Sequence, residues 1–180
     1  MEAGGSAWSA RRRSTPFAAI AAVLALSIAA GCQTSSEPTL ANTFESPEAV
    51  ARAVVKALSE RNLEGLRSLA LTRDEFRVLV WPKLPASRPE RNLPMDYVWD
   101  ELAAKSDASL RARLAGWQDR GFSLVSVEFK GEITDHGTYI VHRDTVLTLK
   151  DRDGRQEAGR LFGSIIQQRG RYKVFSYVVD

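Results

Sequence analysis

The residues best suited to acid–base chemistry in this 180-residue sequence are a histidine and an aspartate two positions apart, His142 and Asp144. They fall within residues 138–150, a run rich in Val, Ile, Thr and Tyr that predicts a β-strand. Side chains alternate between the two faces of a strand, so we expect both groups on the same face. An imidazole and a carboxylate held together can exchange protons with a substrate, and apolar surroundings would raise the pKa of the carboxylate. His142 and Asp144 are therefore the candidate catalytic pair.

Two small residues are expected beside this pair. Asp-Gly at 153–154 and Arg-Gly at 169–170 indicate tight turns, and two-residue turns would place Asp144 near Gly163 and Ser176. Such small side chains leave room for a ligand, so Gly163 and Ser176 are candidate ligand-binding residues. In a second interpretation, Asp144 only hydrogen-bonds the imidazole near solvent. A register error of one residue would also remove the pocket.

A second candidate surface surrounds the proline-rich segment 82–94, PKLPASRPERNLP. Proline lacks an amide donor and has a fixed φ, so this segment is predicted to be a stiff loop. Trp81 precedes it, and Tyr97 and Trp99 follow it. The three rings are candidate ligand-binding residues, because aromatic side chains can stack on a ligand or a peptide. The alternative is that they pack in the core and hold the loop in place.

The only cysteine, Cys32, follows an uncharged run at residues 17–30, and three arginines at 11–13 precede that run. The run is typical of a signal peptide and too short to cross a bilayer, which takes about 18 residues or more. Ala29-Ala30-Gly31-Cys32 resembles the bacterial lipobox, although a lipobox usually has leucine at the position of Ala29. The resemblance implies removal of residues 1–31 and attachment of a lipid to Cys32. An ordinary secretory signal that leaves a free thiol is the alternative.

This interpretation predicts a location in the bacterial cell envelope, with the membrane as a partner through lipidated Cys32. Gln33 stands where lipoproteins retained in the inner membrane commonly have aspartate. It therefore implies the periplasmic face of the outer membrane in a host with two membranes. Residues 32–45 are polar and show no periodicity, which predicts a tether. Residues 46–180 are predicted to form one domain.

The charge balance argues against nucleic acid as a partner. The formal net charge is +3, but three arginines and one glutamate in residues 1–31 account for +2, which leaves +1 for the rest of the chain. Nucleic-acid binding requires clustered lysines and arginines. His136 and His142 are the only histidines and show no ligand-like spacing, so we predict no metal site and no cofactor.

The elements that must position these residues begin with helices. Ser46-Pro47-Glu48 predicts a helix start, because a capping hydroxyl is followed by proline and an acidic residue. Asn62 is expected to cap a short second helix, and Thr72–Glu75 is a capping box that opens a third. The longest helix is predicted from Asp96 to about Gln118.

From residue 122 onward the pattern changes to strands, predicted at residues 122–130, 138–150, 156–168 and 171–179. The turns would pair His142 with Ile165 and Val174, and the opposite face would carry Arg143, Ser164 and Phe175. Helices followed by strands predict an α+β fold, with the N-terminal helices packed on one face of a curved, antiparallel, four-stranded meander.

Two stretches resemble the NTF2-like group, which includes ketosteroid isomerases and polyketide cyclases. They are SPEAVARAVVKALSERNLEGLRSLAL at 46–71 and GRYKVFSYVVD at 170–180. The resemblance implies a curved sheet wrapped round helices as a cone with an internal pocket. Isomerases of the group use a pocket aspartate as base, and Asp144 is the residue that could take that place. The chain departs from the pattern by lacking an early strand between the first helices and by its proline-rich segment, and it is most similar to the group's uncharacterised lipoproteins.

Together these observations favour an envelope lipoprotein whose domain binds a partner protein or a small apolar ligand without catalysis. The alternative is a small isomerase, cyclase or lyase that uses Asp144 and His142 in an internal pocket. A third hypothesis is a homodimer formed through the open face of the sheet, as in many NTF2-like domains.

Overall fold

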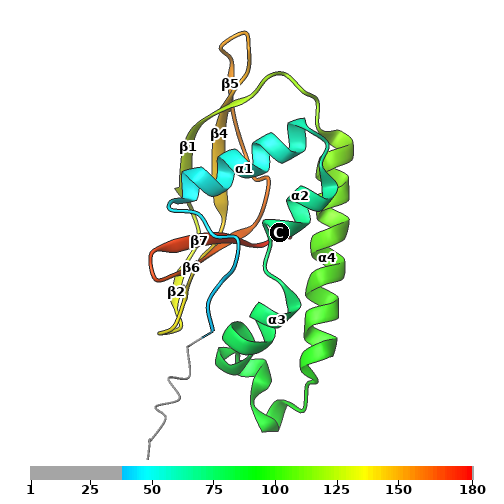
Figure 1. Ribbon diagram of the computed structural model, residues 1–180, viewed down its shortest axis with the longest axis vertical. Coiled ribbons are helices and arrows are strands. Elements are labelled where there is room, and N and C mark those ends of the chain that lie inside the picture. Colours follow the sequence, from blue (N-terminus) through cyan, green and yellow to red (C-terminus); the bar gives the residue numbers. More distant parts are fainter. Residues whose placement is uncertain (1–37, 180) are drawn as a thin grey trace, which may run out of the picture. The chain divides into compact units, whose positions relative to one another are not determined.

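The computed structural model describes residues 38–179. Cys32, the predicted signal peptide and the first six residues of the predicted tether, 32–37, lie outside the described residues. The described chain has a helical part and two antiparallel sheets (Figure 1). The predicted α+β class is therefore correct.

The helical part begins where the capping residues predict. α1 spans Pro47–Ser59, α2 spans Leu63–Ser68 and α3 spans Arg73–Glu75. The Ser46 hydroxyl accepts a hydrogen bond from the Ala49 N–H, and the Asn62 side chain accepts one from the Gly65 N–H. Thr72 and Glu75 form a complete capping box. These contacts confirm the three predicted helix starts.

The proline-rich segment contains short helical turns where a loop without helix was predicted. α3 continues through a π-helical turn, η1 (Phe76–Val80), into a 3-10 turn, η2 (Trp81–Lys83). Two more 3-10 turns follow, η3 (Pro85–Ser87) and η4 (Pro89–Arg91). Proline suits the first positions of such turns, because its φ is already close to helical and its missing N–H is not needed there. α4 then spans Met95–Gly116, close to the long helix that was predicted.

Seven strands follow in the described chain: β1 (Ser123–Phe129), β2 (Ile133–Asp135), β3 (Ile140–His142), β4 (Thr145–Lys150), β5 (Gln156–Gly159), β6 (Ser164–Gln168) and β7 (Arg171–Ser176). One sheet has the order β1-β4-β5, and the other has the order β2-β3-β6-β7. His142 lies opposite Ile165, and Ile165 lies opposite Val174. The pairing predicted for His142 is therefore confirmed.

The predicted four-stranded meander is corrected, because its strands are interrupted and the interruptions lie next to one another. The predicted strand 138–150 is β3 and β4, the predicted strand 156–168 is β5 and β6, and β2 was not predicted. Lys130 N–H donates to Asp144 O, and Thr145 N–H donates to Gly163 O, each at 3.0 Å, so the breaks lie side by side. Asp144 has a left-handed φ of 51° at one of these interruptions. Aligned interruptions bend a sheet, which here becomes two sheets with the predicted neighbour order kept.

Helical elements cover both faces of the four-stranded sheet, where cover on one face was predicted. On one face, Ile165 and Val174 belong to a core that includes α1, α2 and the C-terminal part of α4. On the other face, Val141 and Ile166 belong to a second core formed with η1 and the N-terminal part of α4. Side chains alternate between the two faces of a strand, so the neighbouring residues Ile165 and Ile166 of β6 belong to different cores.

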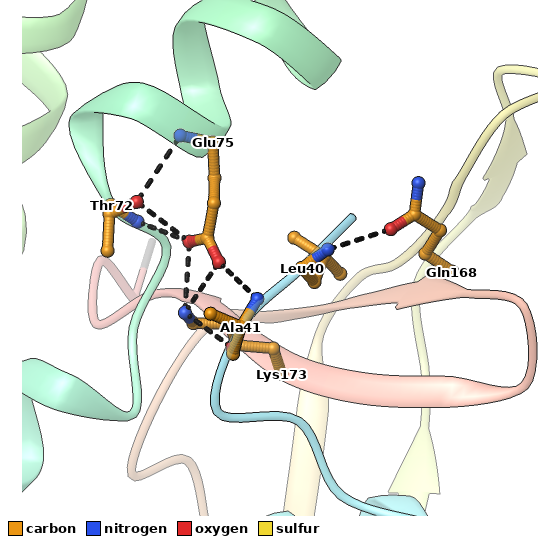
Figure 2. Close-up of polar contacts among 6 residues, drawn as sticks. All are labelled: Leu40, Ala41, Thr72, Glu75, Gln168 and Lys173. Carbon is orange, nitrogen blue, oxygen red and sulfur yellow. Dashed lines mark hydrogen bonds and ion pairs between the residues drawn. The ribbon is translucent and has the colours of Figure 1, made fainter. Parts of the chain in front are cut away.

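Residues 38–45, predicted as part of the tether, are attached to the sheet. Phe44 and Tyr172 exchange backbone hydrogen bonds of 2.8 and 2.9 Å. Ala41 N–H donates to Glu75 at 2.7 Å, and the ammonium group of Lys173 donates to Ala41 O at 2.9 Å (Figure 2). Lys173 also pairs with both carboxylate oxygens of Glu75, at 3.0 and 2.9 Å, so this buried ion pair fixes the segment. The folded region therefore begins before residue 46.

Candidate ligand-binding cleft

A cleft of about 680 Å³ lies between the four-stranded sheet and the helical elements η1, η3 and α4. Its apolar walls come from Val80, Leu84, Leu102, Tyr139, Val141 and Phe175. Polar side chains also line it: Lys105, Glu132, Thr134, His136, Arg143, Ser164 and Ser176. This combination of apolar walls and a few polar groups is typical of small-molecule sites, whose volumes run from about 300 to 1,000 Å³.

Strand periodicity decides which side chains reach the cleft. Val141 and Arg143 are two residues apart at the end of β3, and both line it. Ser164 and Phe175 reach it from β6 and β7. The sequence predicts these residues on the face of the sheet that does not carry His142. The cleft therefore opens on the other side of the sheet from the predicted pocket.

Two aromatic side chains form one part of the cleft wall. The rings of His136 and Tyr139 are stacked, with centroids 4.6 Å apart. The Tyr139 hydroxyl is directed to Val80 O at 3.5 Å. Burial raises the pKa of Tyr139 to about 12, so the phenol remains a neutral hydrogen-bond donor over the physiological pH range.

Thr134, which lines the cleft, has a buried polar atom without a partner. Its hydroxyl oxygen has no hydrogen bond among the described residues. An unpaired buried hydroxyl costs about 1–3 kcal/mol.

The charged groups around the cleft are mostly basic. Arg143 and Glu132 have no side-chain ion pair within the described part of the chain, and Lys105 pairs at 3.5 Å with Glu101, in an exposed position. Exposed pairs of this kind contribute little energy, so Lys105 can also meet a ligand. Among the residues that line the cleft, the two cations Lys105 and Arg143 therefore outnumber the single carboxylate, that of Glu132.

A smaller pocket of about 230 Å³ adjoins the cleft. Leu102, Phe175 and Ser176 line both cavities. Beyond them, the smaller pocket is bounded mainly by apolar groups from α4 and from the segment after α2. The two cavities are therefore neighbours beside α4 and share part of their walls.

The candidate catalytic pair lies on the other face of the sheet. His142 Nε2 hydrogen-bonds Gln167 Oε1 at 2.7 Å, and the imidazole stacks on Phe129 with centroids 4.5 Å apart. Asp144 forms an ion pair with Arg160 at 2.9 Å. Because its Nδ1 is buried without a partner, His142 makes no hydrogen bond to Asp144. Neither residue lines the cleft or the smaller pocket.

The structure separates the two small residues predicted beside that pair. Ser176 is buried and lines both cavities. Gly163 lines neither; a Cβ at this position would lie 1.9 Å from Val178 O. The glycine therefore serves the close approach of two backbone segments.

The aromatic residues around the proline-rich segment also separate. The rings of Trp81 and Trp99 lie 6.3 and 5.3 Å from the ring of Phe76. Both belong to the second core, and Trp99 also lines the smaller pocket. Tyr97 is 59% exposed. The core-packing interpretation thus describes the two tryptophans, while Tyr97 remains on the surface.

Sequence reasoning missed Arg143, Thr134 and Tyr139 as cleft residues. Arg143 and Ser164 were expected on one face of the sheet, but no pattern showed that this face would border a cavity. Thr134 lies on the strand that was not predicted, and Tyr139 lies just before β3. To predict the cleft one would need to know where α4 packs on the sheet. That position depends on contacts between residues far apart in the sequence.

Comparisons with protein-family models, with characterised proteins and with solved structures identify no significant match. Within residues 38–179, no helix combines the length and the hydropathy needed to cross a membrane. No group of three or more His, Cys, Asp or Glu side chains in the same range is placed to hold a metal ion. The function is therefore inferred from the geometry of the cleft.

Proposed function

We propose that this protein is a cell-envelope lipoprotein whose folded domain binds a small, largely apolar molecule in the cleft between the four-stranded sheet and α4. The observation that carries the proposal is the cleft itself, with a volume of about 680 Å³ and apolar walls on both sides. Polar side chains that line it, among them Arg143 and Lys105, provide points where a ligand would be oriented.

Binding accounts for the cleft better than catalysis does. Its hydroxyl residues are Thr134, Tyr139, Ser164 and Ser176, and none of these hydroxyls is hydrogen-bonded to an imidazole or a carboxylate among the described residues. A nucleophile activated by a base needs such a contact. Binding of a ligand between apolar walls and polar side chains needs no such contact.

The aligned breaks in the strands support the proposed relation to the NTF2-like group. In that arrangement a curved sheet encloses a pocket together with helices, and breaks such as those at Lys130–Glu132, Arg143–Asp144 and Arg160–Gly163 allow a sheet to curve. The position of the cleft on the side of the sheet that faces α4 fits the same arrangement.

The proposed envelope location depends on Cys32, which lies outside the described residues. Its support is the sequence alone: an uncharged run, small residues before the cysteine and a polar stretch after it. A lipid at this position would hold the binding domain at the membrane surface.

Binding of the uncharged fluorescent dye Nile red to the chain from Gln33 to Asp180 tests the cleft. This fragment contains the compact unit of residues 36–180. We expect dye fluorescence to rise on binding and the Ser164→Phe variant to lose most of that signal, because the new ring would fill the cleft. The matched control is Ser109→Phe on α4, which lines neither cavity and should bind as the unmodified chain does. Equal binding by both variants, with unchanged circular dichroism, would contradict the proposal.

A further inference from the structure

We infer that the ligand is a single-chain carboxylate amphiphile of the fatty-acid class, with its head group at Arg143 and its tail in the smaller pocket. This inference rests on the proposed binding function and names its ligand. Three observations carry it: the two cavities share Leu102, Phe175 and Ser176 in their walls, the smaller cavity is lined mainly by apolar groups, and the cleft is lined by the basic groups Arg143 and Lys105.

The cavities meet at Leu102 from α4 and at Phe175 and Ser176 from the end of β7. Leu102 and Phe175 are only partly buried, so each keeps some freedom to change rotamer. Moving these two side chains breaks no hydrogen bond, because both are hydrocarbon. A flexible alkyl chain can therefore pass from the cleft into the pocket without unfolding an element.

The smaller pocket is suited to a methylene chain. Trp99, Ala103 and Leu110 contribute apolar surface. The polar side chains that α2 and α4 contribute are already paired: Arg67 donates to Asp107 at 3.0 and 2.7 Å, and the Ser106 hydroxyl accepts from Tyr177 N–H at 3.0 Å. An alkyl chain would leave these contacts intact.

The cleft is suited to an anionic head group. Arg143 presents a guanidinium group without an ion pair in the described chain, and Lys105 lies on α4 across the cleft. Guanidinium binds carboxylate through two parallel hydrogen bonds. The single carboxylate of Glu132 repels an anion, but the two cations Arg143 and Lys105 outnumber it.

Affinities of the Gln33–Asp180 chain for octanoate, dodecanoate and dodecyltrimethylammonium, measured by calorimetry below their micelle concentrations, test the inference. Each methylene that enters an apolar site increases affinity about fourfold, so dodecanoate should bind at least about tenfold more tightly than octanoate. Dodecyltrimethylammonium has the same tail with a cationic head and should bind at least about fivefold more weakly than dodecanoate.

Two matched pairs of variants locate the tail and the head. Ala103→Phe fills the smaller pocket and should weaken dodecanoate about tenfold with little effect on octanoate, whereas Ala104→Phe, on the exposed side of α4, should change neither. Ala103→Leu is the milder alternative where the phenylalanine variant does not fold. Arg143→Gln should weaken both carboxylates about fivefold but not dodecanol, and Arg155→Gln, which lies away from both cavities, should have no effect.

Equal affinity for octanoate and dodecanoate, or an unchanged dodecanoate affinity in Ala103→Phe, would overturn the inference. A preference for the cationic amphiphile would overturn it as well. If Nile red binding is still lost in Ser164→Phe, the cleft remains a binding site and only the ligand class is wrong. If Nile red does not bind at all, the proposed function fails first.

Discussion

Lys173 is the residue with the strongest consequences for stability. Its side chain is 0% exposed, and within residues 38–179 its ammonium group hydrogen-bonds Glu75 and Ala41 O (Figure 2). The Lys173→Met variant would leave the Glu75 carboxylate buried without a cation, and we expect the free energy of unfolding to fall by about 3–5 kcal/mol. Urea denaturation followed by circular dichroism measures this loss.

The control is Lys150→Met, an exposed lysine at the end of β4, for which we expect a change within about 0.5 kcal/mol. The double variant Lys173→Met with Glu75→Leu removes both charges and should recover part of the loss. A Lys173→Met variant as stable as the control would show that the pair does not stabilise the fold.

Glu75 makes stability depend on pH. Burial alone would raise the pKa of its carboxyl, but hydrogen bonds from the Thr72 N–H, from Lys173 and from the Ala41 N–H outweigh burial, so the pKa lies below its ordinary value of 4.5. A lowered folded-state pKa contributes stability above the unfolded-state pKa. We therefore expect this stability to be lost as pH falls through the folded-state pKa of Glu75.

Thermal melts at a series of pH values from neutral downward measure this dependence. In the Glu75→Gln variant, which cannot ionise at this position, the midpoint should be lower at neutral pH and should fall less between pH 5 and the acid end of the series. Parallel curves for the two proteins would be inconsistent with a role for Glu75.

At this scale the sequence predicts local contacts well and distant ones poorly. The caps of α1, α2 and α3 involve residues three apart, so their spacing is visible in the sequence. Lys173 and Glu75 are 98 residues apart, and nothing in either neighbourhood indicates the pairing. The same limit applies to the cleft, whose residues come from elements far apart in the chain.

At the scale of elements, the bend between the two sheets depends on Gly163. A Cβ added there would lie 1.9 Å from Val178 O, a backbone atom that cannot move without shifting the C-terminal segment. We expect Gly163→Ala to lower the free energy of unfolding by about 1–3 kcal/mol. Urea denaturation measures the effect.

Gly159 provides the matched comparison, because it lies at the end of β5 in the same stretch and a Cβ there would contact nothing within 4 Å. Gly159→Ala should therefore change stability by no more than about 0.5 kcal/mol. Similar losses in both variants would mean that chain flexibility, and not the contact with Val178, determines the effect of Gly163→Ala.

The sequence predicts the order of the strands but not their breaks. Alternating Val, Ile and Thr and the Gly-containing turns are enough to set which strands are neighbours. The left-handed conformation of Asp144 and the close approach at Gly163 interrupt runs that look continuous by composition. Such interruptions arise from packing of distant segments, so a pattern of residue types does not reveal them.

For the whole molecule, Cys32→Ser tests the proposed anchor. We expect the unmodified protein in the membrane fraction and the variant in the soluble fraction, because serine has no thiol to carry the lipid. Immunoblots of fractionated cells measure the distribution, and mass spectrometry of the N-terminal peptide measures the modification. An unmodified Cys32 in a membrane-associated protein would show that another feature holds the protein there.

The attachment of residues 38–45 to the sheet has a mechanical consequence under the proposed anchoring. Tension along the chain from Cys32 would enter the fold at Pro38, which accepts a hydrogen bond from Gln168. The load would then reach the buried contacts of Ala41 and next the Phe44–Tyr172 pair, so the bonds would yield one after another. Detachment of residues 38–45 from the sheet would lengthen the chain between Cys32 and α1 by roughly 25 Å before any tension acts on α1. The ion pair between Lys173 and Glu75 would thus hold residues 38–45 on the sheet at low force. At higher force these residues would detach first, so the tension would not reach the cleft.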